Sequence, residues 1–293
     1  GLSYYAEDFE QENLNYDPTN PFSTQFPFDD AYINRAGFLQ MLVDLTPDLR
    51  VIIGGRFDQY SDFDNASTGS LSVNYELLDD QLALFAQVAT AYAVPQAFDL
   101  YGTFGNPTLD PEESVHYEIG LRGQFLDERL SFSAVAFYTD LENLIVFTPS
   151  FSTDNVGQAH NEGFELSAAY DFGLAQIEAD YSYVQAWDDE ASQRLLRRPR
   201  HSGGITATFF PIEDVTVGVS QRFVADRVDI DGGTFARFEA DDYTVGRAFA
   251  TWQITELFSL SARIENLFDE NYEEVDGFPA PERAYYASAR LDF

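Results

Sequence analysis

Histidine, serine and cysteine are the side chains most often used for acid–base and nucleophilic chemistry, and this sequence holds them in no productive pattern. Its 3 histidines, His116, His160 and His201, lack the spacing of metal ligands. Ser202 directly follows His201, but neighbouring residues of a strand point to opposite faces, which separates a nucleophile from its base. Cysteine is absent, so thiol chemistry does not contribute. We therefore expect no catalytic residue and no cofactor.

One acidic stretch, Asp229-Ile230-Asp231-Gly232, resembles the start of a calcium-binding loop. An EF-hand needs a glycine where Thr234 stands and a bidentate glutamate where Ala240 stands. The pattern is therefore incomplete, and we expect no metal site in this sequence.

A basic cluster is the clearest candidate for binding an anion. Its members are Arg194, Arg197, Arg198 and Arg200. Guanidinium groups bind carboxylates and phosphates through paired hydrogen bonds, so the cluster could hold an anionic ligand or the phosphates of lipopolysaccharide. The alternative is that the nearby acids Asp188, Asp189 and Glu190 neutralise it.

Aromatic residues recur in the predicted loops, where they could grip a bulky ligand or simply pack loop against loop. With two members of the basic cluster, they give the candidate ligand-binding residues Tyr101, Phe104, Phe151, Arg197, Arg198 and Phe235.

Composition excludes several classes of protein. The 293 residues are 45% hydrophobic, yet no apolar run approaches the roughly 18 residues of a membrane-spanning helix. The net charge is -34, which argues against a nucleic-acid partner because phosphate contacts need a basic face. Aromatic residues make up 16% of the chain, an excess that fits the aromatic girdles of a membrane barrel.

The elements that carry these residues are predicted to be long alternating strands. Between 258 and 265 the apolar residues Phe258, Leu260, Ala262 and Ile264 alternate with polar ones, and the same period returns over 285–293. Segments of this kind run near ten residues, the length that a tilted strand needs to cross a bilayer. We count about 14 such segments, centred near Tyr4, Met41, Ile53, Val73, Ala86, Ile119, Ala134, Ala168, Ala179, Ala207, Val219, Ala250, Ala262 and Ala289.

The connections between the segments alternate in length. Short turns are predicted at 46–48, 79–80, 127–128, 172–173, 212–214 and 255–256. Longer polar loops are predicted at 13–33, 95–114, 149–157, 188–196, 227–242 and 270–282, and only the connection at 62–67 is brief. Tight turns on one side and long loops on the other are typical of an outer-membrane barrel. The predicted fold is therefore all-β, a transmembrane antiparallel up-and-down barrel.

Charged residues in the central parts of the strands keep to one phase of the alternation. An arginine facing mid-bilayer lipid costs about 2 to 4 kcal/mol, so one misplaced charge would count against the membrane assignment. Asp140 and Glu142 depart from the phase, but we expect that part of the chain to lie beyond the hydrocarbon. The residues predicted to face the lumen or a domain that fills it are Arg56, Glu76, Glu118, Arg122, Glu165, Glu178, Asp180, Arg222, Arg263, Glu265 and Arg290.

Several motifs occur in the order found in one known family. The C-terminal region contains NLFDENYE at 266–273 and GFPAPER at 277–283, followed by a strand that ends in Phe293. Upstream lie FGNPTLDPEES at 104–114, NVGQA at 155–159, EGFE at 162–165 and LLRRPRHS at 195–202. Over about two thirds of its length the chain thus resembles TonB-dependent outer-membrane receptors, and within them the vitamin B12 and siderophore importers.

This resemblance implies a function and a set of partners. Such receptors close a barrel of about 22 strands around a plug, so residues 1–293 are expected to be the C-terminal portion of the barrel, without the plug and about the first eight strands. The implied function is active import of a metal chelate, a ferric siderophore or cobalamin, across the bacterial outer membrane. The implied partners are the chelate, the TonB system acting through an N-terminal plug outside this chain, and outer-membrane lipid with lipopolysaccharide.

Two other interpretations remain open at this point. Fourteen strands could close on themselves as a passive porin or solute channel. A barrel-bound enzyme is the other alternative, and it would depend on His201.

Overall fold

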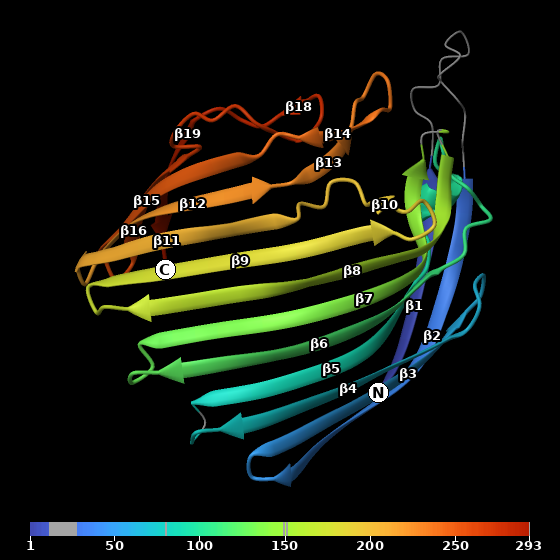
Figure 1. Cartoon of the computed structure of the whole chain (residues 1–293), viewed down its shortest axis with the longest axis horizontal. Coiled ribbons are helices and arrows are strands. Elements are labelled where there is room, and N and C mark those ends of the chain that lie inside the picture. The colour runs from blue at the N-terminus through green and yellow to red at the C-terminus, as the bar shows by residue number, and fades with distance from the viewer. Residues whose placement is uncertain (12–27, 80, 149, 151, 293) are drawn as a thin grey trace.

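The computed structural model describes residues 1–11, 28–79, 81–148, 150 and 152–292. Within these ranges the chain forms one large antiparallel sheet of 15 strands (Figure 1). Fourteen of them pair with their neighbours in chain order, and β10 (Gln193–Arg194) pairs only with β9. The predicted up-and-down β fold is therefore confirmed.

Each alternating segment of the sequence lies within one strand of this path. The strands are β1 (Leu2–Gln11), β2 (Phe28–Thr46), β3 (Leu49–Tyr60), β4 (Ala66–Leu77), β5 (Leu82–Ala93), β6 (Glu112–Phe125), β7 (Leu130–Thr148), β8 (Ser152–Asp171), β9 (Ala175–Asp188), β11 (His201–Ile212), β12 (Val215–Ala225), β15 (Tyr243–Thr255), β16 (Phe258–Glu265) and β19 (Ala284–Leu291).

The predicted short turns all join neighbouring strands at one end of the sheet (Figure 1). In the β8–β9 turn Gly173 has a φ of 88°, which side chains with a Cβ rarely adopt. Its N–H donates to the Asp171 carboxylate at 2.6 Å, which closes the turn. Local turn chemistry thus sets this end of the sheet.

At the opposite end two loops are shorter in the structure than the sequence predicted. Residues 152–157, predicted as loop, belong to β8, and residues 28–33 belong to β2, while 12–27 lie outside the described residues. β7 and β8 reach 19 and 20 residues, and their pairing continues past Asp140 and Glu142. The apolar alternation marks only the part of a strand that meets lipid, whereas backbone pairing continues beyond it.

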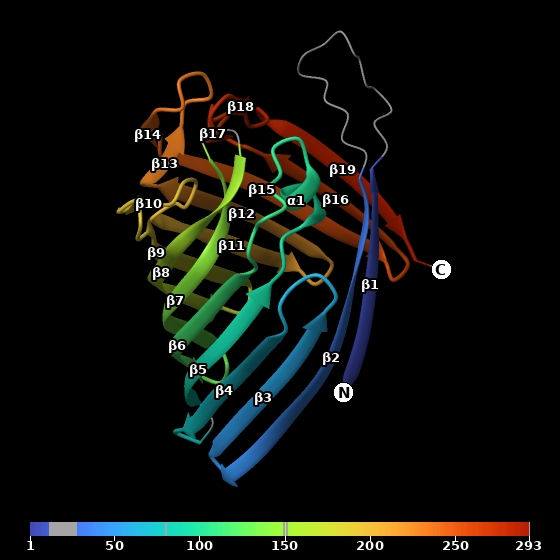
Figure 2. The same cartoon turned by 90° about the vertical axis from the view of Figure 1, so that its right-hand side faces the viewer.

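The long connections contain short elements of their own. A short helix of 5 residues, α1 (Ala97–Tyr101), follows β5. The hairpin β13 (Arg227–Ile230) with β14 (Arg237–Ala240) follows β12, and β17 (Glu273–Val275) with β18 (Phe278–Pro279) follows β16. Figure 2 shows α1 and both hairpins at the loop end of the sheet.

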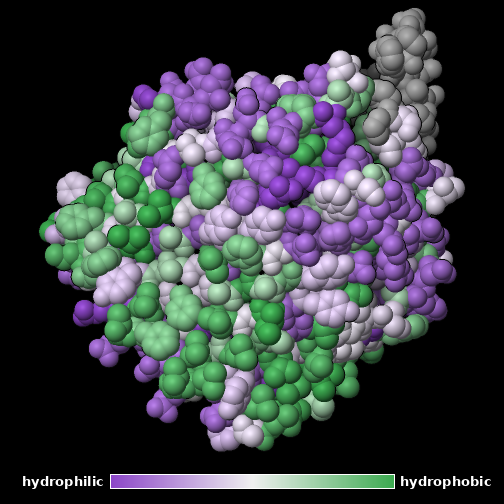
Figure 3. Space-filling model, in the orientation of Figure 1, coloured by the Kyte–Doolittle hydropathy of each residue, from purple (hydrophilic) through white to green (hydrophobic). Residues whose placement is uncertain are grey.

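The sheet has no hydrophobic core among the described residues, where the buried apolar side chains are few and mostly alanine. Large apolar residues are exposed instead, with Leu291 at 64% and Ile177 at 40%. Such a surface is unstable in water, because exposed apolar area of this extent must be covered by lipid or protein. Figure 3 shows hydrophobic residues gathered over the turn end of the strands and hydrophilic residues toward the loop end.

The sheet curls into a deep wall but does not close (Figure 2). No pairing between described residues joins β1 to β19, so both edge strands keep one unpaired side. Over the described residues the chain therefore does not form the self-closed barrel of 14 strands. In a membrane both edges need further strands, because unpaired backbone groups cannot face hydrocarbon. No helix of the described residues is long and apolar enough to cross a membrane.

Candidate functional site

Strand register places all of the predicted lumen residues on one face of the sheet. One row of directly paired residues runs from β4 to β12 through Glu76, Ala83, Arg122, Ser133, Ser167, Asp180, Gly204 and Arg222. Each of the other predicted lumen residues either lies an even number of positions along its strand from a residue of this row, or is linked to such a position by direct pairing with the next strand. They therefore share the face of the row. The eight strands of this row therefore share one polar face.

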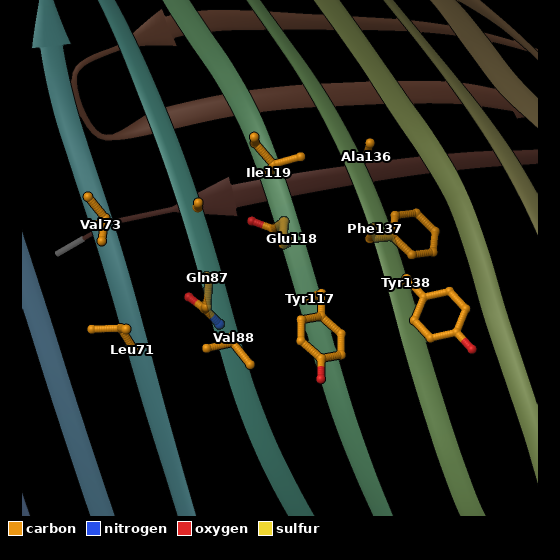
Figure 4. Close-up of a pocket in the computed structure, with 11 residues that line it drawn as sticks. Leu71, Val73, Gln87, Val88, Tyr117, Glu118, Ile119, Ala136, Phe137 and Tyr138 are labelled. Carbon is orange, nitrogen blue, oxygen red and sulfur yellow. The ribbon is translucent and has the colours of Figure 1, made fainter.

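The opposite face is the convex one. In Figure 4 the C-terminal strands pass behind β4–β7, and Leu71, Tyr117 and Tyr138 project away from them. These residues line a hollow of about 540 Å³, together with small residues such as Ala86 and Ala136. An apolar hollow on the convex side fits acyl chains, so it is part of the lipid contact rather than of a ligand site.

Ion pairs on the polar face are unevenly distributed. Arg56 donates from Nε and Nη2 to the Asp58 carboxylate at 2.6 and 2.7 Å, and the Asn34 amide donates to the same carboxylate at 2.9 Å. Arg122, in contrast, forms no ion pair within the described residues: it donates to the side-chain amide oxygen of Asn74 at 2.9 Å and lies 5.6 Å from the centre of the Phe85 ring.

Three acids of β8 and β9 that face the enclosed space have no cation partner among the described residues. Glu165, Glu178 and Asp180 form no ion pair with any residue of the described ranges. Glu118 faces only the His116 ring nitrogen, at 3.5 Å. This part of the wall therefore carries uncompensated negative charge toward the enclosed space.

The basic cluster at the loop end is neutralised, but not by the acids that the sequence suggested. Arg194 and Arg200 both donate to Asp226, at 2.6 and 2.7 Å, and Arg197 donates to Asp229 at 2.8 Å. These acids lie 26 to 32 residues away in the chain, which is why proximity in sequence pointed elsewhere.

The acids that were expected as partners have other contacts. Asp188 accepts the Ala191 N–H at 2.8 Å, and Asp189 pairs with His160 at 2.9 Å. Arg198 is exposed and has no ion pair within the described chain. Its guanidinium is thus fully available to an external anion, whereas Arg197 is only partly available, since its Nε is bonded to Asp229.

Asp229 links three external loops. Its side chain is fully buried and accepts the Arg197 Nε–H at 2.8 Å, the Asp276 N–H at 2.9 Å and the Ile230 N–H at 2.8 Å. Burial alone would raise the pKa of this carboxyl, but the hydrogen bonds outweigh it and hold the pKa below the ordinary value. Residues 189–200, 226–242 and 266–283 are therefore held together, and we call them the three-loop cluster.

The acidic stretch 229–232, which resembles the start of a calcium-binding loop, makes hydrogen bonds within its own loop. Asp231 accepts the N–H groups of Gly233 and Thr234 and the Thr234 hydroxyl, at 3.1, 2.6 and 2.7 Å. These bonds lower the pKa of Asp231, because they favour its charged form. No three His, Asp or Glu side chains of the described residues gather so as to hold a metal ion.

The aromatic candidates form a second, separate group of contacts. The Phe104 ring meets the Phe147 ring edge-on at 5.6 Å, and the Phe104 carbonyl accepts the Thr153 N–H at 2.8 Å. Tyr101 ends α1 beside this group, and Phe151 lies outside the described residues. Figures 1 and 2 both show α1 apart from β13–β14, so the structure does not bring the Tyr101 and Phe104 loop together with Arg197, Arg198 and Phe235.

A small polar pocket of about 260 Å³, which the sequence did not predict, lies between the two C-terminal hairpins. On its wall Arg227, only 6% exposed, donates to the backbone carbonyls of Glu273, at 2.7 Å, and of Glu274. The guanidinium also lies 5.6 Å from the centre of the Tyr243 ring, which stacks on Tyr272 at 4.4 Å. No local signal marks this pocket, because its two sides lie 46 residues apart in the chain.

Comparison with known proteins gives a consistent result. The family model described as TonB dependent receptor-like, beta-barrel matches residues 1–267. The vitamin B12 transporter BtuB of Photobacterium profundum is 29% identical over 247 residues, which cover 81% of this chain and 40% of the relative. The same transporter of Vibrio cholerae is 26% identical over 243 residues, covering 81% of this chain and 39% of the relative.

Solved structures show the same fold. The siderophore receptor PirA from Acinetobacter baumannii superposes with a TM-score of 0.82 at 17% identity, over 100% of this chain and 51% of that one. The copper transporter OprC superposes with a TM-score of 0.80 at 21% identity, over 95% of this chain and 51% of that one. The chain thus spans about half the length of these structures and less than half of the curated relatives.

Proposed function

Because the chain belongs to the family of TonB-dependent receptor-like β-barrels of the bacterial outer membrane, we propose that it is the barrel part of an importer of metal chelates. The imported ligand would be a ferric siderophore or cobalamin, captured by the external loops. Energy from the inner membrane would reach a plug domain through TonB, and the plug would move inside this wall. The barrel itself makes and breaks no bonds.

The observation that carries this proposal is the division of the sheet into two chemically different faces. Charges of both signs line the concave face across β3 to β19, whereas the convex face of the same strands is apolar. Charges need water or a polar partner, so the enclosed space must be hydrated or filled by protein. A plug with basic side chains would satisfy the uncompensated Glu165, Glu178 and Asp180.

Residue roles follow from position. Residues 1–293 would be the C-terminal portion of the barrel, and the lumen residues would line the ligand path or hold the plug. Arg198 is the best candidate of the basic cluster for direct ligand contact, because Arg197 already binds Asp229. Tyr101, Phe104, Phe151 and Phe235 remain candidates as loop aromatics.

A passive porin is not supported, because the sheet has two open edges and the matching family consists of receptors. A barrel-bound enzyme is not supported either. The His201 ring nitrogen is bonded to the Tyr181 hydroxyl at 2.7 Å on the convex face, opposite in direction to Ser202.

The decisive experiment is growth rescue by the complete gene. A host lacking its own receptors would be supplied with a ferric siderophore as sole iron source, or with vitamin B12 as the required vitamin, in strains with and without TonB. We expect rescue only in the TonB-positive strain. Rescue that is independent of TonB would indicate a passive channel, and no rescue by any chelate would refute the proposed function.

A further inference from the structure

From β8 to β19 the enclosed face of the sheet is electrically polarised. On β8 and β9 it carries acids such as Glu165, Glu178 and Asp180, and these strands contain no arginine. The next strand, β11, presents only uncharged side chains to this face. On β12, β15, β16 and β19 the charges are Arg222, Arg247, Arg263, Glu265 and Arg290.

This basic side stands out because the chain as a whole has a net charge of -34. Within these strands Glu265 is the only acid on the enclosed face, and two arginines share it, while Arg290 pairs with Asp292 just beyond β19 at 2.9 Å. Arg247 approaches one of the Glu265 oxygens at 3.4 Å and Arg263 at 3.0 Å. Arg222, exposed on the neighbouring strand, forms no ion pair within the part of the chain that the structure describes.

Aromatic rings alternate with these guanidinium groups. The register Gly218, Phe249, Arg263, Tyr286 sets four neighbouring strands at one level. The Arg263 guanidinium lies 4.3 Å from the Tyr286 ring centre, and that of Arg247 lies 5.4 Å from the Phe249 ring centre. A Cβ on Gly218 would come within 2.3 Å of the Phe249 ring, so the absence of a side chain there lets this ring lie against the wall.

The same chemistry continues to the loop end. Tyr243 and Tyr272 stack at 4.4 Å beside the buried Arg227 guanidinium. Tyr243 lies two residues along β15 from Val245, which pairs with Arg222. We call Arg222, Arg247, Arg263, Phe249 and Tyr286 the arginine–aromatic strip. It starts below this tyrosine pair and follows the strands toward Arg290 at the turn end.

We propose that the arginine–aromatic strip is the side of the lumen along which the ligand passes, and that the ligand is an anionic chelate with planar rings, such as a ferric tris-catecholate. This inference rests on the proposed import function and specifies its ligand class. Nearly half-exposed guanidinium groups attract an anion without desolvating it fully, so they favour transit over tight retention. Rings and guanidinium planes give aromatic ligand groups stacking surfaces, whereas a neutral chelate gains little from the charges.

The test uses the complete receptor gene in the receptor-deficient host, with uptake of radiolabelled iron, or of radiolabelled cobalt for the cobalamin probe, as the readout. The probes are a ferric tris-catecholate and ferric citrate, both anionic, with a neutral ferric trihydroxamate and cyanocobalamin for comparison. The variants are Arg222→Gln with Arg263→Gln, and Arg222→Lys with Arg263→Lys, which retains the charges. Arg129→Gln in the β6–β7 turn is the matched control, since it removes an arginine away from the strip.

We expect the glutamine pair to lower uptake of the anionic chelate by roughly five- to tenfold, with surface binding retained and the lysine pair near the wild-type rate. Unchanged anionic uptake in the glutamine pair would overturn the inference. Equal loss of neutral and anionic uptake, with new sensitivity to large antibiotics, would show that the strip holds the plug and would overturn it too. Import of only the neutral chelates refutes the inference but leaves the proposed function standing, whereas failure of every probe refutes both.

Discussion

The buried carboxylate of Asp229 gives the sharpest prediction about the external loops. Asp229→Ala removes the acceptor of three hydrogen bonds, from Arg197, Asp276 and Ile230. No other acceptor replaces it, because the side chain is fully enclosed. The three-loop cluster should therefore open far more often in this variant than in the wild type.

The loss of stability expected for each variant follows from how far solvent can replace the contact that is removed. The Arg197 side chain is 44% exposed, so water can replace its ion pair and Arg197→Gln should cost about 1 kcal/mol or less. Breaking a buried, hydrogen-bonded charge site leaves donors unsatisfied, and Asp229→Ala should cost about 3 to 5 kcal/mol. Asp229→Ala should thus destabilise the three-loop cluster several times more, in kcal/mol, than Arg197→Gln.

Hydrogen exchange of the Asp276 amide measures this difference directly, because that N–H donates to Asp229 at 2.9 Å. In detergent or nanodiscs, Asp229→Ala should accelerate its exchange by about a hundredfold or more, and Arg197→Gln by about fivefold at most. The amide of Gly69, which donates to the Thr90 hydroxyl in the sheet, should be unaffected in both. Equal exchange in the two variants would refute the argument that burial, rather than the ion pair, holds the loops.

The same carboxylate predicts a pH dependence. The pKa of Asp229 is lower in the folded loops than its ordinary value of 3.8. Its stabilisation is therefore fully present above that value and is lost as the pH falls through the lower folded pKa. Asp276 amide protection should decline below about pH 4 in the wild type and show no such step in Asp229→Ala.

Three further substitutions test the wall and its supports. Ala262→Arg on the convex face should destabilise the folded barrel by about 2 to 4 kcal/mol, whereas Ser261→Arg on the enclosed face should have little effect. Heat-modified gel mobility would measure the folded fraction of each variant. Equal folded yields of the two variants would contradict the lipid contact. Asn266→Ala removes a buried amide that holds residues 266–283, and proteolysis within this loop should increase at a cost of about 1 to 3 kcal/mol. Gly163→Ala places a Cβ 2.0 Å from the Tyr183 carbonyl oxygen, so β8 and β9 cannot pair undisturbed and the folded yield should fall; a normal yield would show that the backbone shifts without loss.

Some of the candidate site was predictable from sequence, and the rest was not. The face of each lumen residue followed from alternation, because a strand offers only two directions for a side chain. The partners of Arg194, Arg197 and Arg200 did not follow, because Asp226 and Asp229 reach them only through the folding back of a loop. The pocket beside Arg227 depends in the same way on two hairpins that meet in space.

Sequence alone determined the 14 strands of the main path, their faces and the end at which the chain turns tightly. Lipid enforces these features residue by residue, since each charge or apolar side chain on the wrong face has its own energetic penalty. The tertiary structure decided which charges find partners, and that β1 and β19 are not paired with each other over the described residues. These properties arise between strands and loops distant in the chain, where the local period of two carries no information.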